Sequence, residues 1–277
     1  MAGKHGNGGK KGRTGSANDE PGRKLDLSGR SFDELTLNRV HTAQLGARDA
    51  RWKDADFAGL QLDDATFAGA MLDDVSFEGA ALHNVTLARA TLTDVSLHGA
   101  TLKDATFKEA TLHDVSFAGM SLHDGSFAGA DLKDVTFAAL TLDDATFADA
   151  QMHNISGERM RVKDATFANM SLSDATLAGA NIVDVSLDGS RIEDTCAKGI
   201  TVHNADLSQA ELRDIDMTGA TLKNANFDNS HFEGVSLRKA TLRDVDLAGA
   251  SIEDANIDGL TINGVRIDEL LALHPQQ

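Results

Sequence analysis

A large apolar residue recurs at every fifth position along most of this 277-residue chain. The series runs through Leu62, Phe67 and Leu72 and keeps its phase as far as Ile267. Residues 25–269 make up 245 positions, or 49 five-residue units, without one inserted or deleted residue. Such a long unbroken phase indicates an internal repeat that governs the whole fold.

Each unit also carries a small or medium apolar residue two positions before the large one, as Ala65 does before Phe67. Apolar side chains at i and i+2 are typical of a strand, whereas recurrence at i+5 fits neither a helical stripe nor continuous strand alternation. A short extended step followed by a turn satisfies both patterns. If each unit forms one side of a square, four units return the chain above its start and the inward residues stack. The pattern predicts an all-β parallel solenoid of about twelve coils.

The units resemble those of the pentapeptide-repeat proteins, whose pattern is Ala, Asp or Asn, Leu, and two variable residues. The resemblance covers nearly all of residues 25–269 and implies a right-handed quadrilateral β-helix. The second position of the unit departs from the family pattern, because it is mostly Thr or Ser and becomes Asp or Asn chiefly toward the C-terminus. Examples are Thr101, Thr106, Thr111, Ser116, Ser121 and Ser126, against Asp206, Asp216, Asn226, Asp246 and Asn256. We therefore expect a family-like core with different surface chemistry.

Four segments are expected along the chain. Residues 1–24 are rich in Gly, Ser, Asn and basic side chains and have no recurring apolar position, which predicts a flexible basic tail. Residues 25–52 follow the phase less strictly and are expected to form the N-terminal cap and first coils. Residues 53–264 are predicted to form the regular β-helix, and residues 265–277 the C-terminal cap.

The C-terminal segment concentrates apolar residues in a short space. Ile267, Leu270, Leu271 and Leu273 follow one another closely, and Asp268 is placed to cap a short helix. We expect these residues to close the exposed end of the core as a lid. The alternative is a homodimer seam between two C-terminal ends, as the resemblance to gyrase-binding members of the family implies.

A second period, of ten residues, separates two kinds of side. Leu holds the positions ending in 2 and Phe prefers those ending in 7, while positions ending in 4 are almost all Asp and those ending in 9 are often Gly. Two edges of the square are therefore expected to carry aspartate ladders. The candidate interaction residues on these edges are Asp64, Asp74, Asp94, Asp104, Asp114, Asp124, Asp134 and Asp144. The competing interpretation is turn chemistry, in which Asp and Asn accept hydrogen bonds from nearby backbone N–H groups.

Three positions break the pattern inside the predicted solenoid. Gly125 takes a small-residue position, whereas Gly157 and Ala197 take large-residue positions. At twenty residues per coil, 157 and 197 share one side, which has no Phe after Phe137. The interior packing on that side is expected to be thinner, with a locally bent wall.

Composition narrows the function further. The net charge of −17 argues against direct binding to nucleic acid or membrane and favours a protein partner with a basic surface. Cys196 is the only cysteine, which excludes an internal disulfide and, with no apolar signal or membrane segment, leads us to expect a cytoplasmic protein.

No catalytic, cofactor or metal site is predicted. His83 and His123 fall on one side of the square but two coils apart, or ~10 Å, which is too far to share an ion. No Ser, His and Asp set stands out from the many similar outward residues, and phosphate-binding and HExxH motifs are absent from the sequence. The sequence therefore predicts a non-enzymatic binding protein.

Charge density suggests what such a protein binds. Outside the basic tail the net charge is −21. Twelve coils make a rod ~58 Å long, so there is one net negative charge per ~2.8 Å of rod axis. Duplex DNA carries one per ~1.7 Å of helix axis. The resemblance implies a DNA mimic that binds DNA gyrase or another DNA-binding protein, as quinolone-resistance members of the family do. The alternative is a structural or scaffolding module that uses flat Thr/Ser-rich faces. A third interpretation is ice binding by rows of Thr, which is less favoured because charged side chains lie beside those rows.

Overall fold

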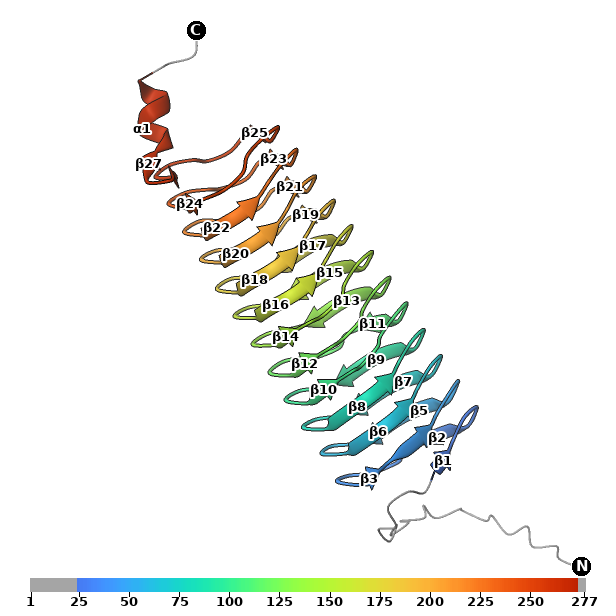
Figure 1. Cartoon of the computed structure of the whole chain (residues 1–277). Helices are drawn as coiled ribbons and strands as arrows, with labels where there is room; N and C mark the ends of the chain where they lie inside the picture. The colour runs from blue at the N-terminus through green and yellow to red at the C-terminus, as the bar shows by residue number, and fades with distance from the viewer. Residues whose placement is uncertain (1–23, 274–277) are drawn as a thin grey trace, which may run out of the picture.

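The computed structural model describes residues 24–273, which form a four-sided parallel β-solenoid of about twelve coils. The coils stack along one axis, with β1 at one end and α1 at the other (Figure 1). This is the fold that the five-residue repeat predicts. The expected flexible tail at residues 1–24 lies outside the described residues, except for Lys24, with which β1 begins.

Strands from alternating ten-residue blocks build two sheets. Sheet A contains β1 (Lys24–Asp26), β3 (His41–Thr42), β4 (Gln44–Gly46), β6 (Gln61–Thr66), β8 (Ala81–Thr86), β10 (Thr101–Lys103), β12 (Ser121–His123), β14 (Thr141–Asp143), β16 (Arg161–Thr166), β18 (Asn181–Ser186), β20 (Thr201–Asp206), β22 (Thr221–Asn226), β24 (Thr241–Arg243), β26 (Thr261–Ile262) and β27 (Val265–Arg266). Sheet B contains β2 (Ser31–Asp33), β5 (Arg51–Asp56), β7 (Met71–Ser76), β9 (Thr91–Ser96), β11 (Thr111–His113), β13 (Asp131–Thr136), β15 (Gln151–Ser156), β17 (Ser171–Thr176), β19 (Arg191–Glu193), β21 (Glu211–Arg213), β23 (His231–Glu233) and β25 (Ser251–Glu253). The described chain has one helix, α1 (Ile267–Ala272). No helix among residues 24–273 is long and apolar enough to cross a membrane.

The pairing register explains why equivalent residues stack. Each parallel ladder joins residue i to residue i+20, as where Thr111 pairs with Asp131 and Leu112 with Leu132. The single antiparallel pair among the described strands is β26 with β27, which ends the solenoid. Any side chain therefore lies directly above the one twenty residues earlier.

Each ten-residue block turns two corners, by two different means. In β7, Leu72 and Val75 are both buried while the two residues between them are exposed, so the chain turns within the strand. The turning residue is Asp74, whose φ of 53° is left-handed. The second corner is a β-turn in which the Ala80 N–H donates to the Phe77 carbonyl at 3.0 Å, with Gly79 at φ 61°. A positive φ at the third turn residue is the mark of a type II turn, where Gly has no steric cost.

Aromatic side chains fill the middle of the rod. Phe107, Phe127 and Phe147 stack with centroids 4.5 and 4.6 Å apart, and each is at most 1% exposed. Phe117 and Phe137 form a second stack at 5.2 Å and meet the first edge to face. These two stacks put the largest apolar areas of the chain into one continuous core.

The irregular positions are accommodated inside the coils. The Gly157 N–H donates to Thr176 at 2.7 Å and the Ala197 N–H to Asp216 at 2.9 Å, so the ladder continues through both. At Gly125 the Leu122 side chain occupies the space that a Cβ would need. What changes at 157 and 197 is the filling of the core, which leaves an internal cavity described below.

The predicted lid over the C-terminal end is wrong. Helix α1 buries no residue, and Leu270, Leu271 and Leu273 are 46%, 51% and 75% exposed. Figure 1 shows α1 pointing away from the last coil. Only Ile267, at its first position, packs on the core, beside Leu260, which is 2% exposed. The helix begins directly after β27 and extends beyond the last coil, so its leucines do not cover the end of the core.

The predicted cap role of Asp268 is also wrong. The helix begins at Ile267, so Arg266 occupies the N-cap and Asp268 lies in the first turn. Its carboxylate instead pairs with Arg266 at 2.5 Å and accepts a hydrogen bond from the Gly259 N–H at 3.0 Å. The Arg266 hydrogen bond, with the Gly259 N–H, holds the pKa of Asp268 well below its usual range. Asp268 thus ties the helix to the preceding turn.

Candidate interaction surfaces

The predicted aspartate ladders occupy two opposite corners of the square. We call corner A the row of positions ending in 4 that belongs to sheet A, from 64 to 244, and corner B the equivalent row of sheet B, from 54 to 254. Corner A holds four of the eight predicted residues, Asp64, Asp104, Asp124 and Asp144. Corner B holds the other four, Asp74, Asp94, Asp114 and Asp134. All eight side chains are exposed except Asp134, which is half-buried.

Backbone conformation explains part of the residue choice at these corners. Every Asp and Asn on corners A and B has φ between 48° and 57°, a left-handed conformation that Asp and Asn tolerate better than other residues with a side chain. At 234 the position is filled by Gly, with φ 66°. Turn chemistry is therefore present, but through the backbone of the corner residue.

The side-chain acceptors for the turn are found elsewhere, at positions ending in 6. The Asp56 carboxylate accepts a hydrogen bond from the Ala58 N–H at 3.0 Å, and the Ser116 hydroxyl lies 3.4 Å from the Ala118 N–H. Thr or Ser and Asp or Asn thus perform the same task two residues before the second corner. The same contact is made by Thr66, Ser76, Ser96, Thr106 and Ser126, so part of the hydroxyl rows at these positions serves the turns.

Asn side chains on the corners interrupt the charge. Asn84 donates its side-chain amide to Asp64 at 2.5 Å, and Asn204 donates to Asp184 at 2.7 Å, in each case one coil below. Asn154 makes the same bond to Asp134. An amide above a carboxylate replaces like-charge repulsion by a charge-assisted hydrogen bond.

Between these interruptions each corner carries five consecutive aspartates. On corner A they are Asp104, Asp124, Asp144, Asp164 and Asp184; on corner B they are Asp54, Asp74, Asp94, Asp114 and Asp134. Stacked coils lie ~4.8 Å apart, so each run covers ~19 Å. These two runs are the longest unbroken rows of aspartate in the described chain.

Basic side chains lie beside three of the five aspartates of the corner A run. His83 Nε2 lies 3.3 Å from Asp104, and His123 Nε2 lies 3.1 Å from Asp124. Lys163 bonds Asp164 at 2.6 Å, and this hydrogen bond raises the pKa of the lysine. The charge of the histidine pairs depends on protonation, so corner A is a partly compensated row.

The N-terminal part of corner B is different. Within residues 24–273, Asp54, Asp74 and Asp94 make no ion pair within 4.0 Å. Farther along the same corner, His113 lies between Asp114 at 2.8 Å and Asp134 at 3.3 Å. Asp54, Asp74 and Asp94 therefore form the longest run of consecutive corner aspartates without an ion pair in the described part of the chain.

Two groups bring an imidazole and two carboxylates together, one at each corner. Their ligand atoms lie within 4.8 Å of one another, in His113, Asp114 and Asp134 on corner B and in His123, Asp143 and Asp144 on corner A. The sequence prediction considered only pairs of histidines and missed these neighbours, which an inspection of positions 20 and 21 residues away would have found. In both groups the imidazole nitrogens already face carboxylates, so their arrangement is that of surface ion pairs.

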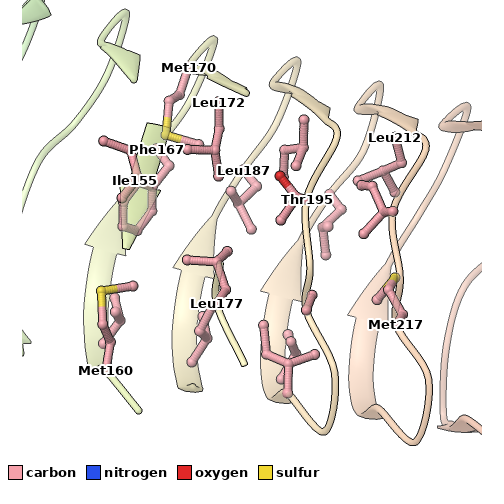
Figure 2. Close-up of a pocket in the computed structure, with 18 of the residues that line it drawn as sticks. Ile155, Met160, Phe167, Met170, Leu172, Leu177, Leu187, Thr195, Leu212 and Met217 are labelled. Carbon is pink, nitrogen blue, oxygen red and sulfur yellow. The ribbon is translucent and has the colours of Figure 1, made fainter. Parts of the chain in front are cut away.

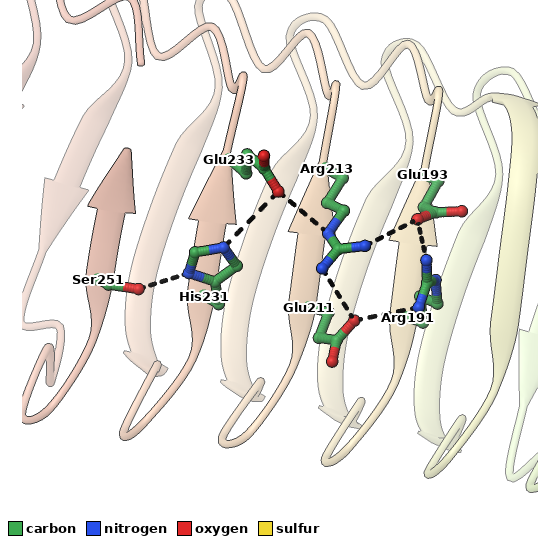
Figure 3. Close-up of polar contacts among 7 residues, drawn as sticks. All are labelled: Arg191, Glu193, Glu211, Arg213, His231, Glu233 and Ser251. Carbon is green, nitrogen blue, oxygen red and sulfur yellow. Dashed lines mark hydrogen bonds and ion pairs between the residues drawn. The ribbon is translucent and has the colours of Figure 1, made fainter. Parts of the chain in front are cut away.

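An ion-pair network covers the outer face of sheet B toward the C-terminus. Figure 3 shows Arg213 between three glutamates, with its Nε 3.2 Å from Glu233 and its other nitrogens 3.7 and 3.8 Å from Glu193 and Glu211. Arg191 joins Glu193 at 2.6 Å and Glu211 at 3.3 Å. These acidic groups have partners within the chain, so this face offers little free charge.

The predicted C-terminal residues form an exposed apolar surface. It consists of Leu270, Leu271 and Leu273 at the end of the helix and of Val265 just before it, which is 50% exposed. Ile267 is half-buried and does not share in it. This surface and the two aspartate corners are the features of the described residues suited to binding another protein.

The geometry defines a rod-shaped repeat protein, a four-sided parallel β-solenoid of five-residue units. Family models agree with this class: a pentapeptide repeat region matches residues 70–147, and pentapeptide repeats in eight copies match residues 50–89, 203–238 and 225–259. Together these matches cover more than half of the chain. The chain belongs to the pentapeptide-repeat family.

Solved structures of the same kind are similar at low identity. HetL from the cyanobacterium Nostoc sp. strain PCC 7120, a pentapeptide-repeat protein involved in heterocyst differentiation regulation, is 20% identical over 86% of this chain and 92% of its own, with a TM-score of 0.31. A trypsin-treated form of QnrB1, a plasmid-mediated fluoroquinolone resistance protein, is 15% identical over 70% of this chain and 94% of its own, with a TM-score of 0.33. A pentapeptide-repeat protein of the Arabidopsis thaliana thylakoid lumen is 29% identical over 36% of this chain and 66% of its own, with a TM-score of 0.22. No curated protein sequence matches the chain.

Proposed function

We propose that this protein is a non-enzymatic, cytoplasmic binding protein that presents its aspartate corners to a basic surface of a DNA-binding protein, with DNA gyrase as the first partner to test. The observation that carries the proposal is the run of Asp54, Asp74 and Asp94, which stand one above another without an ion pair in the described chain. Like charges at ~4.8 Å intervals cost stability unless a partner neutralises them. Turn geometry alone does not require charge at these positions, since Asn adopts the same φ at 84, 154, 204 and 224.

The spacing of the corners suits a surface that binds DNA. The two runs overlap only over residues 104–134, where one charge per coil on each corner gives one per ~2.4 Å of axis, against ~1.7 Å for duplex DNA. A protein that binds the phosphate backbone does so largely through Lys and Arg in a salt-dependent manner. The same residues would bind a regular row of carboxylates.

The test is a gyrase supercoiling assay with the purified protein at low salt, together with competition by duplex DNA. We expect inhibition that weakens steeply with added salt. A triple variant, Asp54→Asn, Asp74→Asn and Asp94→Asn, keeps the left-handed turn residues and removes three charges. It is expected to reduce inhibition at least tenfold.

A matched control removes the same charge from the other two corners. Glu109→Gln, Asp149→Asn and Asp228→Asn lie at or beside the second turn of their blocks, away from corners A and B. This control is expected to inhibit as the original protein does. Absence of inhibition at low salt, or equal inhibition by both triple variants, would overturn the proposal. A partner recovered by pull-down that tolerates high salt would instead favour the scaffolding role of the Thr/Ser-rich faces.

We also propose that two copies join through the C-terminal ends. Leu270 and Leu271 of helix α1 and Leu273 at its C-cap are exposed and costly to leave in water, and the same residues of a second copy would cover them in a two-fold dimer. Sedimentation velocity is expected to show a dimer that the double variant Leu271→Lys and Leu273→Lys converts to monomer. A monomer at micromolar concentration of the unmodified chain would contradict the dimer but leave the role of the corners untouched.

A further inference from the structure

An internal cavity occupies the core where the aromatic stacks end. Its volume is about 100 Å³, and its lining runs from Phe137 to Leu222. Figure 2 shows residues of this lining, among them Phe167, Leu177 and Met217. Residues 137 to 217 on one side span four coil steps, or ~19 Å, so the cavity is elongated along the axis. Phe167 and Leu177, inward residues of the kind that is fully buried elsewhere in the rod, are only half-buried here because they face this space.

The sequence explains why the cavity lies here. One side carries Phe117 and Phe137 and then continues with Gly157, Leu177 and Ala197, each smaller than the two Phe residues earlier on that side. The space next to Gly157 is partly filled, because an added Cβ would lie 2.8 Å from Leu177 and 2.9 Å from Met160. These flexible side chains close only part of the gap, and the rest remains as the cavity.

The wall of the cavity has no polar group to offer. Thr195 is its one polar residue, and its hydroxyl donates to the Glu193 carbonyl at 2.8 Å. Nearby, the buried Ser190 hydroxyl donates to the Phe167 carbonyl at 2.6 Å and accepts from the Met170 N–H at 3.2 Å. Water needs two to four polar partners, so an apolar cavity of this kind stays dry and is open to apolar ligands.

Methionine makes the cavity adaptable. Of the seven methionines in the chain, Met152, Met160, Met170 and Met217 line this space. A thioether side chain has three rotatable bonds and adjusts to irregular volumes. The lining can therefore rearrange around a guest more cheaply than an aromatic stack can.

We propose that the cavity binds a small, uncharged, unbranched hydrocarbon. Its elongated shape favours a chain over a ring, and its volume is below the ~150 Å³ of an apolar protein cavity that admits benzene. The absence of polar wall atoms excludes a ligand whose hydroxyl or carboxylate would lie inside. This site is inside the rod and is independent of the corners that carry the proposed function.

The methionine methyl groups that line the cavity can report binding by NMR. In a sample labelled with ¹³C at the methionine methyls, n-butane is expected to shift the signals of Met152, Met160, Met170 and Met217. Met120, which is buried in the aromatic part of the core, and the exposed Met71 serve as internal references. Propan-1-ol has the same number of heavy atoms as n-butane and should leave the four signals unchanged at equal concentration. No shift with n-butane, equal shifts at the two references, or equal effects of propan-1-ol would overturn the proposal.

A filled cavity gives a second test. Ala197→Leu places a large side chain where equivalent positions carry Leu177, Met217 or Phe137, and it should abolish the n-butane shifts. Ala47→Leu is the matched control, since Ala47 also holds a large-residue position but lies far from the cavity. It should retain the shifts. If Ala197→Leu fails to fold, the comparison of the four lining methionines with Met120 still decides the question.

Discussion

Asn84 lies one coil above Asp64 and donates its side-chain amide to that carboxylate at 2.5 Å. The next residue on corner A is Asp104, so Asn84 separates one carboxylate from a run of five. Asn84→Asp would join them into seven consecutive carboxylates. We expect it to destabilise the rod by about 0.2–1 kcal/mol at low salt, because like charges directly opposite repel.

The salt dependence of this loss identifies its cause. At 1 M salt, where the Debye length is ~3 Å, the thermal midpoint of Asn84→Asp, followed by circular dichroism, should rise toward that of the original protein and stay below it by the effect of the lost amide hydrogen bond. Asn84→Gly, which keeps the turn and adds no charge, should lose the amide bond without this dependence on salt. An Asn84→Asp midpoint that does not change with salt would refute the electrostatic account.

Ala139 has a backbone conformation that a residue with a Cβ disfavours. It has φ 55° at the turn position where most blocks carry Gly, in a turn closed by the Leu140 N–H to Phe137 carbonyl bond at 3.0 Å. Ala139→Gly should stabilise by up to about 1 kcal/mol, since the ~1–2 kcal/mol that the left-handed conformation costs a residue with a Cβ is partly offset by the ~0.5–1 kcal/mol entropic cost of Gly. Urea unfolding measures the effect. Ala138→Gly, in the same turn but without a positive φ, should destabilise instead.

Phe127 should be among the most costly residues to truncate. It is fully buried and stacks on Phe107 at 4.5 Å and on Phe147 at 4.6 Å. Phe127→Ala is expected to cost about 3–5 kcal/mol. Phe167→Ala, at the half-buried edge of the cavity, should cost less in the same unfolding experiment, and a larger loss at Phe167 would argue that the cavity is not present in solution.

Ser190 joins two coils through its hydroxyl. The hydroxyl donates to the Phe167 carbonyl and accepts from the Met170 N–H, in a position that is Ala in most blocks. Ser190→Ala keeps the packing and should cost about 0.5–1.5 kcal/mol, the usual net value of a hydrogen bond. Faster hydrogen exchange of the Met170 amide would locate the loss, whereas unchanged exchange would contradict it.

Asp268 predicts how the C-terminal end responds to pH. Its pKa is lowered, chiefly by the Arg266 hydrogen bond and also by the Gly259 N–H. A lowered folded-state pKa stabilises the fold at pH values above the unfolded value of about 3.9, and this contribution is lost as pH falls through the folded-state pKa. A carboxyl-carbon NMR titration should therefore show Asp268 still ionised at pH 3.5.

A variant checks this contact at neutral pH. Asp268→Asn should speed hydrogen exchange of the Gly259 amide at pH 7 and leave corner amides, such as that of Asp104, unchanged. If Asp268 titrates near pH 4 in the original protein, the ion pair with Arg266 does not persist in solution.

The strict five-residue phase made the solenoid predictable, because residues such as Leu112 and Leu132 can stack only if the chain returns every twenty residues. The end was not predictable in the same way. Whether Asp268 caps a helix depends on where β27 stops, and no repeat precedes it to set that boundary. The exposed leucines follow from the direction of α1, which composition does not encode.

The corner chemistry was predictable in part. The sequence identified Asp at positions ending in 4, but their left-handed φ and the hydrogen-bonding role of residues such as Asp56 and Ser116 two positions later required coordinates. Pairs such as His83 with Asp104 join residues 21 apart and become visible once the coil length is known. The thinning predicted at Gly157 and Ala197 appears as a cavity, because Leu177 and Met160 fill only part of the space.

Because four five-residue units make one coil, the position of a residue in the repeat decides which side or corner of the rod it occupies. Removing a single five-residue unit would rotate everything beyond it by a quarter turn, so that an aspartate corner would continue into a glycine-rich one. Removing ten residues would rotate it by half a turn and join corner A to corner B, leaving both acidic edges intact although their members change. Phase, rather than length, is therefore what insertions and deletions in this protein must preserve.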